Sequence, residues 1–131
     1  MELIAGLKSK FTHEISENEL ATNWRNDVPV LATPVLLWLT ELSCMKTIEQ
    51  SELSTNQMTV GYAHEMKHLA ATPMGHTINI ESELVEVSGK KLIFKVVGYD
   101  FHDKVVEGYH TRFIIDKEKF LKNLAQKELV K

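Results

Sequence analysis

Apolar and polar residues alternate along four stretches in the second half of the chain, and this alternation predicts four β-strands. The stretches cover residues 59–65, 77–87, 91–99 and 105–115. Ser88-Gly89-Lys90 and the four residues 100–103 have the composition of turns and separate the last three stretches. We therefore expect those three strands to form an antiparallel meander. A weaker alternation at 10–16 predicts one further short strand.

A long helix is predicted at 34–49, between the first strand and the other four. Thr33 fits an N-cap, and Pro34 fits the first helical position, where no N–H donor is needed. A short amphipathic helix, N-capped by Asp116, follows the last strand. The order β-α-β-β-β-β-α predicts an α+β fold, with the long helix against one antiparallel sheet. The length of 131 residues fits a single domain, 1–131.

Glu41 lies in the middle of the apolar side of the predicted long helix. At 100° per residue, the side chains within about 60° of it are Pro34, Leu37, Trp38, Cys44, Met45 and Ile48. The opposite, wet side is expected to carry Thr40, Ser43, Lys46, Thr47 and Gln50. A carboxylate on an apolar face must be paired, hydrogen-bonded or open to a cavity, because its desolvation is costly. Glu41 is therefore either a structural ion-pair partner or a functional group.

Composition excludes several classes of function. Fifteen Lys and Arg against eighteen Asp and Glu give a net charge of −3, without the concentrated basic patch that nucleic-acid binding needs. The longest apolar stretch, 28–39, is too short for a membrane span. The chain does not begin with a signal peptide, and one cysteine, Cys44, allows no internal disulfide. We expect a cytoplasmic protein that binds neither nucleic acid nor membrane.

The segment from His64 to Gly75 supports two incompatible interpretations. As a helix, it contains the His-Glu-x-x-His zinc signature. As a strand running into a turn, it separates His64 from His68 by about 13 Å, too far for one ion. The strand-prone residues before Gly61, and Thr72-Pro73 shortly after His68, favour the strand. We therefore expect no metal and no cofactor, His64 as an ordinary strand residue, and His110 as a structural one that could still line a site.

From Phe11 to Phe120 the chain resembles the hotdog-fold thioesterases, and most closely the fluoroacetyl-CoA thioesterase-like branch. Each motif is short, but their order and spacing together are fairly specific. The motifs are Ala32-Thr33 at the helix start, Glu41 eight residues later, Gly61 seven residues before His68, His68-x-Ala-Ala-Thr-Pro-x-Gly, and Gly108-x-His-x-Arg112.

This resemblance implies a hotdog fold, in which a curved antiparallel sheet of about five strands wraps a long central helix. It implies a homodimer, with a tetramer as the alternative assembly, and active sites at the dimer interface. The family's catalytic threonine, glutamate and histidine correspond to Thr33, Glu41 and His68. Its substrate-binding glycine and arginine correspond to Gly61 and Arg112.

The implied activity is acyl-CoA thioesterase-like hydrolysis of a small or medium acyl thioester. The helix N-terminus at Thr33 offers free N–H groups to a thioester oxyanion. Glu41 lies about two turns further on, so substrate or another subunit must bridge that span. Pro34 follows Thr33 where the fluoroacetyl branch usually has glycine, so we do not expect fluoroacetate detoxification. A non-catalytic acyl- or CoA-binding hotdog module is the alternative, and a zinc hydrolase is a third hypothesis.

Overall fold

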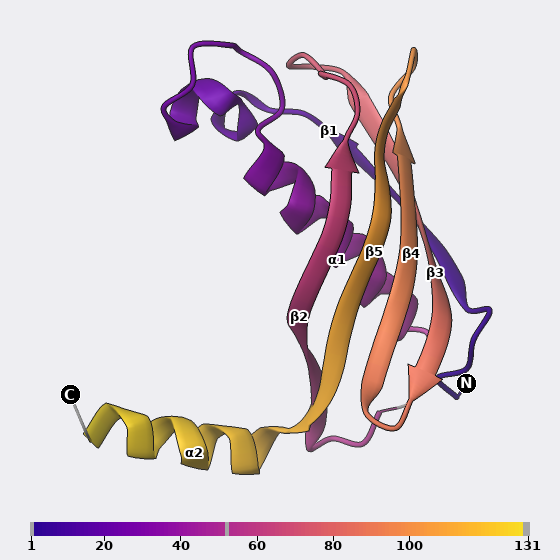
Figure 1. Cartoon of the computed structure of the whole chain (residues 1–131), viewed down its shortest axis with the longest axis vertical. Coiled ribbons are helices and arrows are strands. Elements are labelled where there is room, and N and C mark those ends of the chain that lie inside the picture. Colours follow the sequence, from indigo (N-terminus) through magenta and orange to yellow (C-terminus); the bar gives the residue numbers. More distant parts are fainter. Residues whose placement is uncertain (1, 52, 130–131) are drawn as a thin grey trace.

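One long helix lies against a curved, five-stranded antiparallel sheet (Figure 1). The computed structural model describes residues 2–51 and 53–129. The sheet order is β1-β3-β4-β5-β2, so β1 and β2 are its edges. The main elements are β1 (Lys8–Glu14), α1 (Thr33–Ile48), β2 (Gln57–His68), β3 (Thr77–Ser88), β4 (Lys91–Tyr99), β5 (Lys104–Asp116) and α2 (Lys117–Leu129).

The structure confirms the predicted element order and the antiparallel meander of β3, β4 and β5. It also confirms the strand interpretation of the histidine motif, because β2 extends to His68. Two short 3-10 helices, Glu17–Glu19 and Ala21–Trp24, lie between β1 and α1. Asp116 Oδ1 accepts the Lys119 N–H at 3.0 Å, as the predicted cap requires. Helix α2 then extends away from the sheet (Figure 1).

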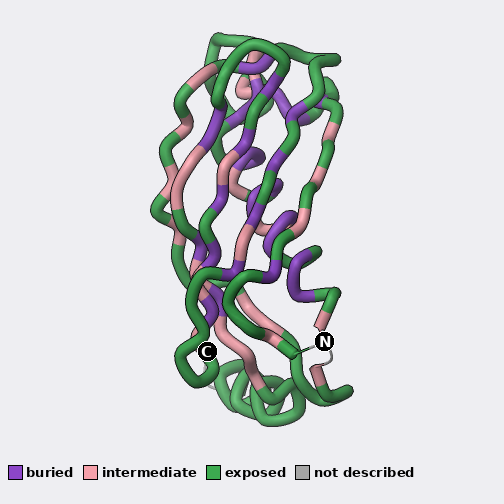
Figure 2. The backbone as a smooth tube through the Cα atoms, turned by 90° about the vertical axis from the view of Figure 1, so that its right-hand side faces the viewer, coloured by how far each residue is buried: buried purple, intermediate pink, exposed green. Residues whose placement is uncertain are grey.

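The hydrophobic core lies between α1 and the middle strands of the sheet. Buried residues alternate with exposed ones along β3 and β4, so one face of each strand is turned to the core (Figure 2). The largest buried side chain, Phe94, is completely inaccessible. Its neighbours in the core include Leu36, Leu39, Ile80 and Leu92. The core thereby fixes α1 against β3 and β4. It also determines the position along the strands at which each side chain of the helix contacts the sheet.

The expected wet side of α1 is wrong at Thr40, Ser43 and Thr47, which pack against the sheet, whereas Lys46 and Gln50 are exposed as expected. Thr40, Ser43 and Thr47 are fully buried. Ser82 of β3 meets the Ser43 hydroxyl at 3.0 Å and the Thr47 hydroxyl at 2.8 Å. Hydroxyls that satisfy one another can be buried at little cost, so this polar face can lie on the sheet. Sequence periodicity alone reads the same residues as solvent-facing.

The opposite side of α1 is left half-exposed and forms what we call the open stripe, residues Leu37, Trp38, Glu41 and Met45. Trp38 is 50% exposed and Met45 is 42% exposed. The stripe lies beside β2, whose other edge has no neighbour in the described sheet. An apolar stripe next to a free strand edge is a surface that commonly receives another chain.

No helix within the described ranges is long and apolar enough to cross a membrane.

Candidate active site

Thr33 and His68 form a hydrogen-bonded pair at one end of the open stripe. Thr33 Oγ1 lies 2.8 Å from His68 Nδ1. The predicted N-cap role of Thr33 is wrong: Ala32 holds the N-cap position, and Thr33 is the first residue of α1. Its hydroxyl is therefore directed to the last residue of β2 instead of to the helix backbone. Thr33 is exposed, at the positive end of the helix dipole.

Burial lowers the pKa of His68 below its usual value, so this imidazole is neutral at pH 7. Its second nitrogen, Nε2, is buried without a hydrogen-bond partner among the described residues. A neutral imidazole held against an exposed hydroxyl can orient that hydroxyl and exchange a proton with it.

Glu41 and Arg112 form a second group further along α1. Arg112 Nη1 donates to Glu41 Oε1 at 3.1 Å, and Arg112 itself is 4% exposed. The guanidinium is fixed by Thr59, with Nε donating to Oγ1 at 2.9 Å and Nη2 donating to the carbonyl oxygen at 3.1 Å. A Cβ at Gly61 would overlap with Glu41 Oε1. Gly61 and Arg112 thus determine where the carboxylate sits.

His110 supports the arginine rather than the glutamate. Its Nδ1 bonds the Ala63 carbonyl oxygen at 2.9 Å, which requires a proton on Nδ1. Burial lowers the pKa of His110 to about 4, so the ring is neutral at pH 7 and its Nε2 carries a lone pair. That lone pair accepts from Arg112 Nη1 at 3.2 Å. His110 lies 3.6 Å from Glu41 but, being neutral, forms no ion pair with it.

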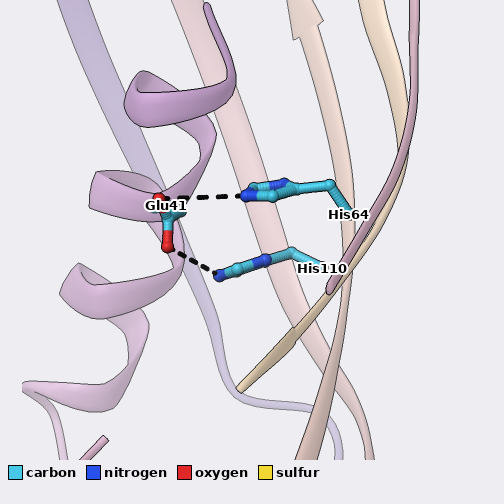
Figure 3. A group of neighbouring side chains, drawn as sticks. All are labelled: Glu41, His64 and His110. Atoms are coloured by element: carbon cyan, nitrogen blue, oxygen red, sulfur yellow. Dashed lines mark ion pairs between the residues drawn. The ribbon is translucent and has the colours of Figure 1, made fainter. Parts of the chain in front are cut away.

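His64 also faces Glu41, although the sequence suggested an ordinary strand residue. Its ring stacks on that of His110, with centroids 4.2 Å apart, and its Nε2 lies 3.8 Å from Glu41 Oε2 (Figure 3). His64 shares a strand face with His68, because regular pairing runs from Ala63 to His68. A β-bulge precedes this stretch: Gly61 pairs with Arg112 and Ala63 pairs with the next residue back, Thr111. The extra residue turns Gly61 toward α1 as well. Counting back from His68 in steps of two would have placed His64 on the same face.

Glu41, His64 and His110 could in principle hold a metal ion, since one ligand atom from each lies within 4.8 Å of the others. The Arg112 guanidinium lies 3.1 Å from Glu41 Oε1 and 3.2 Å from His110 Nε2. A fixed positive charge beside two of the three ligand atoms opposes a divalent cation there. The zinc signature does not assemble either, because His64 and His68 are four residues apart on a strand, about 13 Å.

The five residues expected at the site thus fall into two groups within one chain. Thr33 and His68 lie together, and Glu41 lies with Gly61 and Arg112. Thr33 and Glu41 are eight residues apart in α1, about 12 Å along its axis. One chain therefore presents a hydroxyl–imidazole pair and a separate carboxylate, held through one oxygen by Arg112, on the same open side.

A long helix on a curved five-stranded antiparallel sheet in this order defines the hotdog fold. A family model described as fluoroacetyl-CoA-specific thioesterase matches residues 15–118. The fluoroacetyl-CoA thioesterase of Streptantibioticus cattleyicolor is 34% identical over 98 residues, which is 75% of this chain and 70% of that protein. The chain therefore belongs to the fluoroacetyl-CoA-specific thioesterase family. It is a thioester hydrolase of the acyl-CoA thioesterase type.

Solved structures agree with this assignment. A structure of the fluoroacetyl-CoA thioesterase FlK superposes with a TM-score of 0.88 at 26% identity, covering 97% of this chain and 98% of that one. A thioesterase superfamily member from Thermus thermophilus gives a TM-score of 0.87 at 19% identity, with 98% of each chain covered. The second likeness shows the fold alone.

Proposed function

We propose that the protein hydrolyses a small or medium acyl-CoA thioester at a site shared between two copies of the chain. The observation that carries this proposal is the Glu41 carboxylate, held by Arg112 on an open stripe that no part of the described chain covers. A related structure supports CoA as the thiol, because a variant of the fluoroacetyl-CoA-specific thioesterase has been solved in complex with fluoroacetate and CoA. The proposed site needs no cofactor or metal.

Two copies are needed because the two groups in one subunit are too far apart to act on one carbonyl. Thr33 is about 12 Å from Glu41 along the helix, and His68 is about 13 Å from His64 along the strand. A thioester carbonyl requires its activating groups within about 3 Å. A second subunit supplies the missing group if its own Thr33–His68 pair approaches Glu41.

A twofold dimer axis that passes Met66 of β2 and Leu37 of α1 would achieve this. The Leu69 N–H donates to the Val105 carbonyl oxygen in β5, so by the alternation of the ladder the backbone of Met66 faces the free edge. Antiparallel pairing of two β2 strands about Met66 places the partner's His68 opposite His64. On α1, an axis near Leu37 places the partner's Thr33 beside Glu41. Met66 lies midway between His64 and His68, and Leu37 lies midway between Thr33 and Glu41. In such a dimer, Trp38 is covered by the partner's helix.

The arrangement supports a hydrolysis that uses each group once. The partner's Thr33, held by the partner's His68, donates its hydroxyl proton to the thioester carbonyl oxygen at the positive helix end. Glu41 takes a proton from water, whose oxygen attacks the carbonyl carbon. Collapse of the tetrahedral intermediate breaks the C–S bond and releases the acid. Glu41 passes the proton it took from water to the neutral histidine through solvent, and the resulting imidazolium protonates the departing thiolate.

Fluoroacetyl-CoA itself is not the substrate we propose, since Pro34 follows Thr33 in this chain. Proline fixes its own φ and constrains the residue before it, so the helix entrance beside the carbonyl is stiffer than with glycine. The single cysteine favours a reducing cytoplasm as the setting.

A panel of acyl-CoAs of increasing chain length, with thiol release as the signal, tests the proposal. We expect turnover of short or medium chains, and loss of at least about 100-fold in kcat for Glu41→Gln. Saturable CoA binding without turnover of any substrate would instead support a non-catalytic acyl- or CoA-binding module. Turnover that survives in both Glu41→Gln and His68→Ala would contradict the assigned residues.

A further inference from the structure

The two oxygens of the Glu41 carboxylate are held unequally in the isolated subunit. Oε1 accepts a hydrogen bond from Arg112 and lies against Gly61. Oε2 has His64 Nε2 at 3.8 Å, which is beyond hydrogen-bond length. The last torsion of a glutamate side chain is soft, because it joins an sp³ to an sp² carbon. One hydrogen bond therefore leaves the second oxygen, and with it the plane of the carboxylate, poorly determined.

His110 cannot supply the second contact. Its Nδ1 proton is committed to the Ala63 carbonyl oxygen, and its Nε2 lone pair is turned toward Arg112. The remaining donor near the carboxylate, among the described residues, is His64.

The surroundings of His64 select the tautomer that can donate to Glu41. Its Nδ1 is buried and has no hydrogen-bond partner among the described residues. A proton on Nδ1 would leave that buried N–H without an acceptor, at a cost of about 1–3 kcal/mol, and would turn the Nε2 lone pair toward the Glu41 carboxylate. The proton is therefore best placed on Nε2, the atom that faces Glu41 Oε2. Stacking on His110 keeps the ring in that orientation.

We propose that His64 is a positioning residue for Glu41, donating its Nε2 proton to Oε2 when substrate closes the site. Catalytic hydrogen bonds are often long in unliganded structures and shorten in the complex, so 3.8 Å is a resting distance. Arg112 then holds one oxygen and His64 the other, which fixes the carboxylate plane for the attacking water. The proposal rests on the proposed hydrolysis at a shared site, and it gives the first histidine of the His-Glu-x-x-His motif a role without metal.

Two substitutions at His64 test this role, because they separate the effect of its N–H donor from the effect of its stacked ring. His64→Phe keeps the stack on His110 but has no donor, and His64→Gln restores an N–H at the distance of Nε2. We expect kcat of His64→Phe to fall about 10- to 100-fold, the usual effect of a misplaced catalytic group, with KM within about twofold. His64→Gln should recover most of the loss. His102→Phe, in the β4–β5 turn, is the control. If His64→Phe does not fold, His64→Asn replaces it, since its amide is too short to reach Oε2.

Heterodimers of tagged subunits show whether His64 acts through Glu41. In one heterodimer, a subunit with both Thr33→Ala and His64→Phe is paired with a wild-type subunit. Its one surviving site uses the Glu41 of the doubly substituted subunit, so its kcat should fall as in the His64→Phe homodimer. In the matched heterodimer, Thr33→Ala and His64→Phe are on different subunits, and the surviving site keeps a wild-type His64.

Equal kcat in these two heterodimers would overturn the positioning role, as would a His64→Gln protein as slow as His64→Phe. Failure of the proposed function looks different. In that case the wild-type protein itself shows no hydrolysis, or a heterodimer of Thr33→Ala with Glu41→Gln subunits shows none.

Discussion

Arg112 Nη1 donates to Glu41 Oε1 across 3.1 Å, from a guanidinium whose other nitrogens are both fixed by Thr59. The carboxylate on α1 is therefore placed by β5 and by β2 at once. Gly61 leaves the space that the carboxylate occupies, because any side chain at this position would overlap with Glu41 Oε1.

Gly61→Ala should displace the Glu41 carboxylate while leaving the fold intact. We expect kcat to fall at least about tenfold, since a shift of about 1 Å in a catalytic group can cost 100-fold. Tyr62→Phe is the matched control, because the side chain of Tyr62, next to Gly61 in sequence, is 70% exposed and packs on Phe113. Steady-state kinetics and thermal unfolding of both variants measure the effect. Unchanged kcat in Gly61→Ala would show that the position of the carboxylate does not limit the reaction.

Trp38→Glu should convert the proposed dimer to a monomer and abolish hydrolysis. Trp38 is 50% exposed in the subunit and lies next to the proposed twofold axis, where a glutamate would face its own copy. Light scattering coupled to size exclusion measures the mass of each variant. Lys46→Gln, on the same helix but off the open stripe, should remain dimeric and active. A monomeric wild-type protein with full activity would contradict the shared site.

Stability should fall with acid, because His110 is neutral and buried in the folded protein. Its folded pKa is about 4, below the usual imidazole value, so between these two pH values the unfolded chain binds more protons. The free energy of unfolding therefore decreases as pH falls through this window, by up to about 3 kcal/mol from this one group. Urea unfolding of the wild type and of His110→Gln at pH 7 and pH 4.5 measures the difference. The variant should lose less stability over that interval than the wild type.

Dialysis against a chelator should leave hydrolysis unchanged, since Arg112 stands beside two of the three candidate metal ligands. Metal analysis of the same samples is the companion measurement. Stoichiometric zinc that is lost in His64→Ala, together with loss of activity, would establish a metal centre instead.

The sequence predicts the fold well where one rule decides the outcome. Period-two alternation and turn residues identify β3, β4 and β5, and Thr33-Pro34 places the start of α1 within one residue. The buried face of α1 was predicted wrongly because the hydroxyls of Ser43 and Thr47 bond to residues on distant strands, and the Thr40 hydroxyl bonds the Leu37 carbonyl oxygen within the helix. Helical periodicity carries no information about such partners.

The site was predictable in its residue types but not in its grouping. Motif spacing selects Thr33, Glu41, His68, Gly61 and Arg112, yet it does not show that Glu41 is separated from His68 within one subunit. The position of His64 follows from alternation with His68, whereas that of Gly61 depends on the bulge after it, which breaks strict alternation at one residue. A bulge is visible in the pairing of β2 with β5 and has no clear signature in the sequence of β2 alone.

A heterodimer of one Thr33→Ala subunit and one Glu41→Gln subunit tests the shared site most directly. If Glu41 serves the partner's Thr33 and the partner's His68, this heterodimer contains one complete site. We predict that each homodimeric variant is nearly inactive on acyl-CoA, while the heterodimer recovers about half of the wild-type kcat, because one of its two sites is intact. A heterodimer as inactive as both homodimers would contradict a site built from two subunits.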